Sequence, residues 1–229
     1  MTETSAKIPL VARGLAADAE ALLMEALPRH RHALSRDAVR ASQAARILVA
    51  TAEVVAANGY AGTTAKAIAR RAGVSQKTFY ELFDNKEQAF LAAYAGVDLV
   101  IERTRAAAAK HAEPRAMLAA GIRTYLEILD AEPAFSRMLV IEAVGAGPRV
   151  LARRARGFDA FVSALELPLA LARASDPTLP EPDRDLLLTV IGGVNEVVLQ
   201  RLVAGDPAPL VDLLPLAMEL IERAFLRPV

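Results

Sequence analysis

The chain has 229 residues, of which 54% are hydrophobic, and it lacks Trp, a composition that favours one or two helical domains with a sizeable core. The absence of Cys excludes a disulfide framework, a thiolate metal site and a cysteine nucleophile, and is compatible with a cytoplasmic protein. The longest uncharged run, 54–65, has 12 residues, fewer than the ~18 of a membrane span, and the N-terminus carries no signal-peptide pattern.

The net charge is zero, but the charges are unevenly distributed. Residues 29–86 contain ten Lys or Arg against four Asp or Glu, a balance of +6, whereas residues from 87 onward contain 15 against 19, a balance of −4. This concentration of positive charge indicates a side that faces a polyanion, although a solvated basic face also fits the charge alone.

Residues 1–36 are interpreted as an N-terminal extension. A weak amphipathic helix covers 1–28, and a basic arm, RHRHALSR, follows it. His30 and His32 lie in this arm without a nearby carboxylate or thiolate, so we expect no metal site there. We expect no cofactor elsewhere in the chain.

Residues 37–84 carry the pattern of three short helices. The first, 37–58, has an apolar side and stops at Gly59. One Thr of the pair at 63–64 caps the second helix, which runs to Ala72.

A sharp corner follows the second helix. Gly73 can take the positive φ that such a corner needs, and the Ser75 hydroxyl can cap the third helix, 76–83. Phe79 is expected to be buried where the two helices cross. This pattern predicts a helix-turn-helix, whose second helix enters the DNA major groove.

The third helix leaves four polar side chains facing outward: Gln76, Lys77, Thr78 and Tyr80. Their amide, ammonium, hydroxyl and phenol groups can bond base edges or phosphates. Lys86 opens the next helix, where a cation opposes the helix dipole by ~0.3–1 kcal/mol. A DNA phosphate shared with the helix N-terminus would explain it, and an exposed lysine at a tolerable cost is the alternative.

The basic arm lies directly before this unit, so Arg29 and Arg31 are predicted to reach the minor groove or its phosphates. Alternatively, residues 1–28 fold back as an extra helix and hold the arm on the protein surface.

Residues 48–94, including NGYAGTTAKAIARRAGVSQKTFYELFDNKEQAFLAAY, resemble the DNA-binding end of the tetracycline-repressor (TetR) family. The paired Thr, the AGVS corner, the TFYELF helix and the following Lys fall at family spacing. The resemblance implies a homodimeric regulator whose C-terminal helices bind a small molecule and shift the two DNA-reading heads apart. With the arm and the cap, the candidate DNA contacts are Arg29, Arg31, Thr64, Ser75, Gln76, Lys77, Thr78, Tyr80 and Lys86. LPRHRHALSR also resembles an N-terminal arm of actinobacterial-type members, whereas the shortest members lack the first ~35 residues.

Residues 85–229 are predicted to form a helical domain for ligand binding and dimerisation, which makes the fold class all-α. Its helices are predicted at 86–110, 114–130, 133–144, 148–174, 182–203 and 209–226. Pro168 and Pro215 fall inside two of these patterns and predict a kink or a break at each.

Residues 186–202 are apolar around most of the helix circumference, which predicts a helix that buries two faces. We expect one face to meet a second copy of the chain, together with the helix at 209–226, in a four-helix interface. A central helix buried in a monomer is the alternative.

A small apolar effector is predicted to bind among the middle helices. The candidate ligand-binding residues are Tyr94, Tyr125, Phe135, Met138, Glu142, Phe158 and Asn195. Most of the larger side chains in this region are expected to be ordinary core. Glu142 and Asn195 need polar partners on apolar faces, and an arginine such as Arg123 is favoured over a ligand as that partner.

No phosphate loop, metal-spaced cluster or nucleophile elbow is present, so the chain is not predicted to be an enzyme. We expect a ligand-responsive repressor that binds a palindromic double-stranded DNA operator, with no membrane partner. The alternative is a non-specific DNA-binding protein or a scaffold without an effector.

Overall fold

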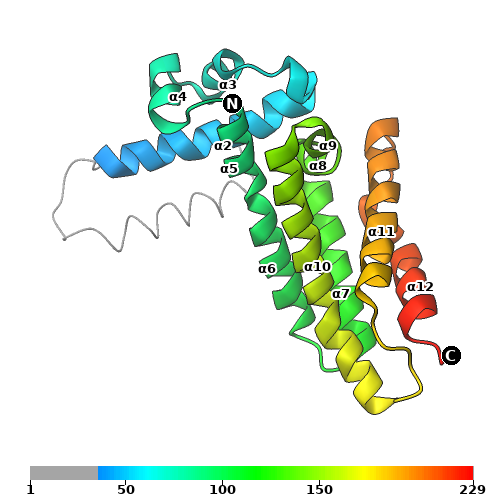
Figure 1. Cartoon of the computed structure of the whole chain (residues 1–229). Coiled ribbons are helices and arrows are strands. Elements are labelled where there is room, and N and C mark those ends of the chain that lie inside the picture. Colours follow the sequence, from blue (N-terminus) through cyan, green and yellow to red (C-terminus); the bar gives the residue numbers. More distant parts are fainter. Residues whose placement is uncertain (1–35, 229) are drawn as a thin grey trace, which may run out of the picture. The chain divides into compact units, whose positions relative to one another are not determined.

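The computed structural model describes residues 36–228, and every regular element among them is a helix, which confirms the predicted all-α class for this range. The chain divides into two compact units between Gly96 and Val97 (Figure 1). The predicted helix at 1–28 and the candidate contacts Arg29 and Arg31 lie outside the described residues.

The described part of the first unit consists of α2 (Arg36–Gly62), α3 (Ala65–Ala72), α4 (Gln76–Leu82) and α5 (Lys86–Tyr94). Gly59 interrupts the helical backbone of α2 with φ 69°, so the predicted stop is present as a kink. The core lies where these helices meet, and Ile47, Ile68 and Phe79 are fully buried in it. Burying a side chain of this size contributes ~1.5–3 kcal/mol.

The structure places α5 with the first unit, although the sequence suggested a boundary after residue 84. The apolar face of α5 holds it there, because Phe90 is fully buried and its ring meets the Tyr60 ring edge-on at 5.2 Å. The helix predicted at 86–110 is divided at Ala95 into α5 and α6.

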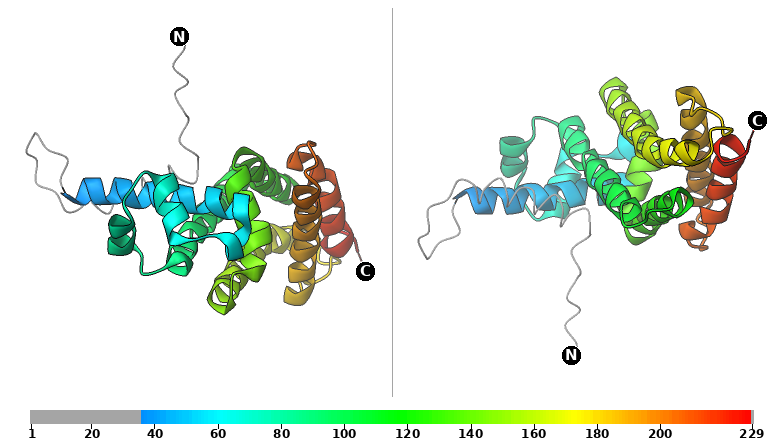
Figure 2. Two further views of the ribbon diagram at one scale, coloured as in Figure 1. Left: turned by 90° about the horizontal axis from the view of Figure 1, so that it is seen from above. Right: turned by 90° about the horizontal axis from the view of Figure 1, so that it is seen from below.

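The second unit is built from the following elements: α6 (Gly96–Ala108), α7 (Pro114–Ala131), α8 (Pro133–Arg137), η1 (Met138–Glu142), α9 (Ala143–Gly145), α10 (Pro148–Ser175), α11 (Arg184–Ala204), η2 (Leu210–Leu213) and α12 (Leu214–Phe225). Within this unit α7 packs against α10 and α12. Both views in Figure 2 show α11 and α12 side by side at one edge of the unit.

Two local details differ from the predicted helices of the second unit. The helix predicted at 133–144 contains a π-helical turn, η1, whose first three residues are buried. Pro168 is buried inside α10, which continues through it without a break, so packing there offsets the missing hydrogen bond. At Pro215, by contrast, the predicted break is present, because η2 ends and α12 begins one residue earlier.

Candidate functional site

The corner between α3 and α4 is held by backbone hydrogen bonds. Gly73 adopts the left-handed conformation with φ 66°, as its place in the sequence predicted. The Val74 N–H donates to the Ala69 carbonyl at 3.0 Å, which closes the end of α3. At the start of α4 the Ser75 hydroxyl accepts from the Thr78 N–H at 3.0 Å, so the cap is also confirmed.

The predicted DNA-contacting residues of α4 differ in exposure. Gln76, Lys77 and Tyr80 are exposed, and 57% of Tyr80 is accessible. The Lys77 ammonium lies 3.9 Å from the Glu81 carboxylate, a distance at which an exposed pair restrains it little. Thr78 is half-buried, and its hydroxyl lies 2.9 Å from that of Ser75. The available face of α4 therefore presents an amide, an ammonium and a phenol.

Thr64 caps α3, and its hydroxyl oxygen accepts from the Ala67 N–H at 3.1 Å. The side chain is exposed, and its O–H remains able to donate to a phosphate. The other residue of the pair, Thr63, is buried and donates to the Gly59 carbonyl at 2.8 Å. The structure thus separates two adjacent threonines into a buried brace and an exposed cap.

Lys86 is half-buried and points to the end of α2. Its ammonium donates to the Tyr60 carbonyl at 2.9 Å, to the Thr63 carbonyl at 3.0 Å and to the Ala61 carbonyl at 3.4 Å. It also lies 4.5 Å from the centre of the Tyr60 ring. The last carbonyls of a helix lack intrahelical partners, and a lysine has three N–H donors to offer them. A DNA phosphate was the partner predicted for these donors, with an exposed lysine as the alternative.

The Tyr60 ring remains neutral beside this ammonium. Burial, and after it the Glu87 carboxylate, raises the pKa of the Tyr60 hydroxyl above its ordinary value of 10.0. The contact between Lys86 and Tyr60 is therefore one between a cation and a neutral ring.

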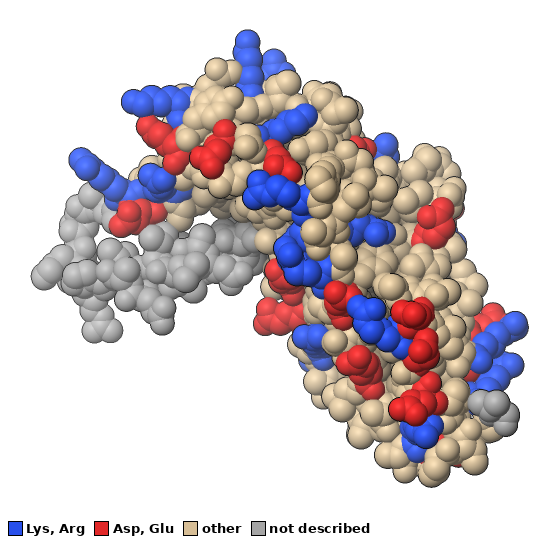
Figure 3. Space-filling view, viewed as in Figure 1, with Lys and Arg blue, Asp and Glu red and all other residues tan. Residues whose placement is uncertain are grey.

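The surface of the first unit is rich in exposed cations (Figure 3). The exposed Lys and Arg of its described part are Arg36, Arg40, Arg46, Lys66, Arg70, Arg71 and Lys77. Arg71 pairs with Glu53 at 2.8 Å, and Arg40 donates to the Glu81 carbonyl at 2.8 Å. The others supply the long-range positive potential that the charge distribution predicted.

The second unit contains a partly open cavity of about 90 Å³ between α6, α7, α10, α11 and α12. Three predicted ligand-binding residues line it: Tyr125, Phe158 and Asn195. The Tyr125 ring meets that of Phe161 edge-on at 5.2 Å, which places these two aromatic side chains in one wall.

Four other predicted ligand-binding residues do not line this cavity. Tyr94 ends α5 in the first unit, where its ring stacks on Phe90 at 6.2 Å. Phe135 lies in the buried face of α8, while Met138 and Glu142 lie in the π-helical turn. Apolar character alone does not distinguish a core position from a cavity wall.

Arg105 was not singled out from the sequence, although it lines the cavity. It is exposed, and its guanidinium donates to the Ala160 carbonyl on α10 at 3.1 Å. Its only local signal is a place beside Thr104 in an alanine-rich helix, and that pattern equally fits a surface arginine.

The described residues contain no group of three or more His, Cys, Asp or Glu placed to hold a metal ion. One helix in the described range, α11, is long and apolar enough to cross a membrane by length and composition. The core helix of a soluble protein passes the same test, so this is weak support for a membrane span.

Residues 47–93 match the family model of the tetR family of bacterial regulatory proteins. A comparison with curated proteins finds no match. Among solved structures, FadR of Bacillus subtilis, determined in complex with stearoyl-CoA, is 24% identical, with a TM-score of 0.70 over 77% of this chain and 96% of that chain.

Two further solved structures share the fold. FadR of Bacillus halodurans, a fatty acid degradation regulator, is 18% identical, with a TM-score of 0.72 over 78% of this chain and 94% of that chain. A TetR family transcription regulator of Marinobacter aquaeolei VT8 is 24% identical, with a TM-score of 0.62 over 80% and 95% of the two chains. Residues 47–93, which include the α3–α4 corner, therefore carry the DNA-binding unit of the tetR family of bacterial regulatory proteins, and the chain shares its fold with these regulators.

Proposed function

We propose that the chain acts as a homodimeric repressor that binds a palindromic operator and releases it when an acyl-chain effector enters the cavity of the second unit. One observation carries this proposal: the same chain holds an exposed helix-turn-helix and a mainly apolar cavity. A regulator of this kind works where the DNA is, in the cytoplasm.

The face of α4 supports sequence-specific reading. Gln76 and Lys77 occupy its first turn, and recognition helices contact base edges with their N-terminal residues. Thr64 and the exposed cations around it are suited to phosphates. A single short helix reads few base pairs, so an operator with two half-sites requires two copies of the chain.

An outward stripe on α11 supports the dimer. The residues of this stripe recur at intervals of three and four, and all are exposed in the single chain. They are Leu186, Thr189, Gly193, Glu196, Gln200 and Val203. A Cβ added at Gly192 or Gly193 would meet nothing within 4 Å. A second chain can therefore bring its helix backbone close to this stripe, with α12 alongside.

The structural neighbours support an acyl-chain effector. The B. subtilis FadR structure contains stearoyl-CoA, and this chain has the same fold and an apolar cavity. The cavity of about 90 Å³ is below the ~300 Å³ at which pockets take drug-sized ligands. A long acyl chain would therefore move the lining helices apart, and a ligand that favours a widened state can shift the DNA-binding equilibrium.

The alternative, a non-specific DNA-binding protein or scaffold, needs neither the cavity nor an effector. Titration of labelled genomic fragments at two salt concentrations separates the two functions, since non-specific phosphate contacts weaken steeply with salt. We expect a few fragments to stay bound at the higher salt and to be released by stearoyl-CoA. Uniform loss of all fragments, with no response to stearoyl-CoA, would support the alternative.

A further inference from the structure

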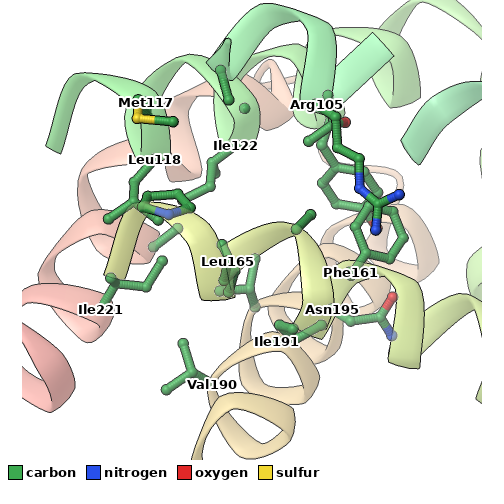
Figure 4. A pocket seen from close by; sticks show the side chains of 18 of the residues that line it. Arg105, Met117, Leu118, Ile122, Phe161, Leu165, Val190, Ile191, Asn195 and Ile221 are labelled. Carbon is green, nitrogen blue, oxygen red and sulfur yellow. The ribbon is translucent and has the colours of Figure 1, made fainter. Parts of the chain in front are cut away.

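The cavity of the second unit has two chemically different ends. Figure 4 shows Arg105, Phe161 and Asn195 at one end, and Met117, Leu118 and Ile221 at the other. Along α10 the lining residues run from Phe158 to Pro168, about 15 Å at the helical rise of 1.5 Å per residue. A ligand that spans the cavity therefore meets polar groups at one end and hydrocarbon at the other.

Arg105 is the one charged side chain among the described residues that line the cavity. Arg115 and Arg153 of the same unit each pair with a carboxylate at 2.6 Å. Arg105 instead donates one hydrogen bond to the Ala160 carbonyl, although a guanidinium has five N–H donors. It is exposed, so it marks the mouth of the cavity with unused donors.

Asn195 faces the same end from α11 and is half-buried. Its neighbours in the wall, Ile191 and Val194, are apolar. Within the described part of the chain its side-chain amide has no hydrogen-bond partner. The amide is not closed off from solvent, since no described side-chain N or O atom is both buried and without a partner, so its N–H groups are available to an oxygen atom of a ligand.

We propose that the effector is a single-chain amphiphile with an anionic group at one end. The anion binds the Arg105 guanidinium and the Asn195 amide, and the chain runs toward Met117 and Ile221. This inference rests on the proposed function and specifies the ligand of the same cavity. The mouth has no carboxylate among the described lining residues, so it discriminates against an amphiphile with a cationic head.

The test measures ligand binding by isothermal titration calorimetry on the full chain without DNA. Four ligands share one alkyl chain: dodecanoate, dodecanoyl-CoA, dodecanol and dodecylamine. We expect dodecanoate or dodecanoyl-CoA to bind at least about tenfold more tightly than dodecanol, the factor expected for one charge-assisted hydrogen bond. Dodecylamine should bind more weakly than dodecanol. Because DNA is absent from this experiment, it tests ligand binding separately from the proposed control of operator binding.

Two cavity variants and one control complete the experiment. R105Q should weaken the anionic ligands about tenfold and leave dodecanol unchanged, and N195L should weaken them by a smaller factor. R156Q removes the same charge from an exposed site on α10 outside the cavity and should change neither. If R105Q weakens the binding of dodecanoate alone, the group bound by Arg105 is a free carboxylate. If R105Q also weakens the binding of dodecanoyl-CoA, the CoA phosphates reach the Arg105 guanidinium. Equal affinity for dodecanol and the anions, or an equal effect of R105Q and R156Q, would overturn the proposal.

Discussion

Replacement of Lys86 by Met distinguishes its contacts in the structure from a role on DNA. Met keeps the unbranched apolar stem but removes the three bonds to the Tyr60, Ala61 and Thr63 carbonyls. Hydrogen bonds to a charged group contribute ~1.5–3 kcal/mol when buried, and Lys86 is only half-buried, so we expect a loss of about 2 kcal/mol for the set. A unit of this size loses roughly 10 °C in Tm for such a change.

Two measurements on the same variant decide the question. Circular dichroism gives Tm, and the affinity for random-sequence DNA at several salt concentrations gives the number of phosphates neutralised. For Lys86→Met we expect the lower Tm and an unchanged salt slope, because the donors of Lys86 serve the end of α2. Lys77→Met is the matched control, since 87% of its side chain is exposed and its loss should change stability by less than ~0.5 kcal/mol.

The opposite pattern would refute this reasoning. If Lys86 neutralises a phosphate in the complex, the salt slope falls by ~0.9 and Tm is preserved. The ammonium would then have left the carbonyls of α2 for DNA.

Three further predictions concern the two proposed interfaces. Gln76→Ala or Lys77→Ala should weaken binding at particular base pairs by ~1–3 kcal/mol each, which a competition series of single-base operator variants measures; uniform loss across the series would make both backbone contacts. Gly193→Glu should give a monomer by sedimentation with helicity retained. A Cβ at this position meets nothing within the single chain, whereas a partner helix would bury the carboxylate. A variant that remains dimeric would show that the interface lies elsewhere. Removal of residues 1–32 should erase footprint protection at the outer, A·T-rich positions if Arg29 and Arg31 reach the minor groove, and an unaltered footprint with a lower Tm would assign the segment a structural role.

The helix-turn-helix could be predicted because its signals are local. Gly73, Ser75 and Phe79 each have a conformation or burial that the sequence around them dictates, and the structure confirms all three. The place of α5 in the first unit could not be read from the sequence, because the packing of Phe90 against Tyr60 joins residues from α5 and α2. That contact depends on tertiary structure.

The cavity was only partly predictable for the same reason. Asn195 was predicted to bind a ligand because it is an amide on an apolar helix, and it lines the cavity. Phe135 and Met138 carry equally apolar side chains, but α8 and η1 pack them into the core. The Arg105 guanidinium is positioned by the Ala160 carbonyl, 55 positions away in the sequence. A pattern of local residue spacing cannot predict a contact over that separation.

Lys86 shows how a residue that fits a sequence pattern can have a different role in the fold. Its place in the first turn of a helix suggested an anion, because a cation there opposes the helix dipole. In the structure its partners are carbonyl oxygens at the end of α2 and just after it. A cation at a helix N-terminus indicates an electronegative partner, and only the tertiary structure specifies which one.

The measurement that tests ligand-controlled DNA binding most directly is the affinity of one effector for the free protein and for its operator complex. If effector and operator favour different states of the chain, each weakens the other by the same factor, and we predict at least about fivefold. Stearoyl-CoA is titrated by calorimetry with and without saturating operator, and the operator is titrated by fluorescence anisotropy with and without stearoyl-CoA. Matching factors in the two titrations are the predicted result. Stearoyl-CoA that binds the free protein and the operator complex with equal affinity would contradict control of DNA binding by the cavity.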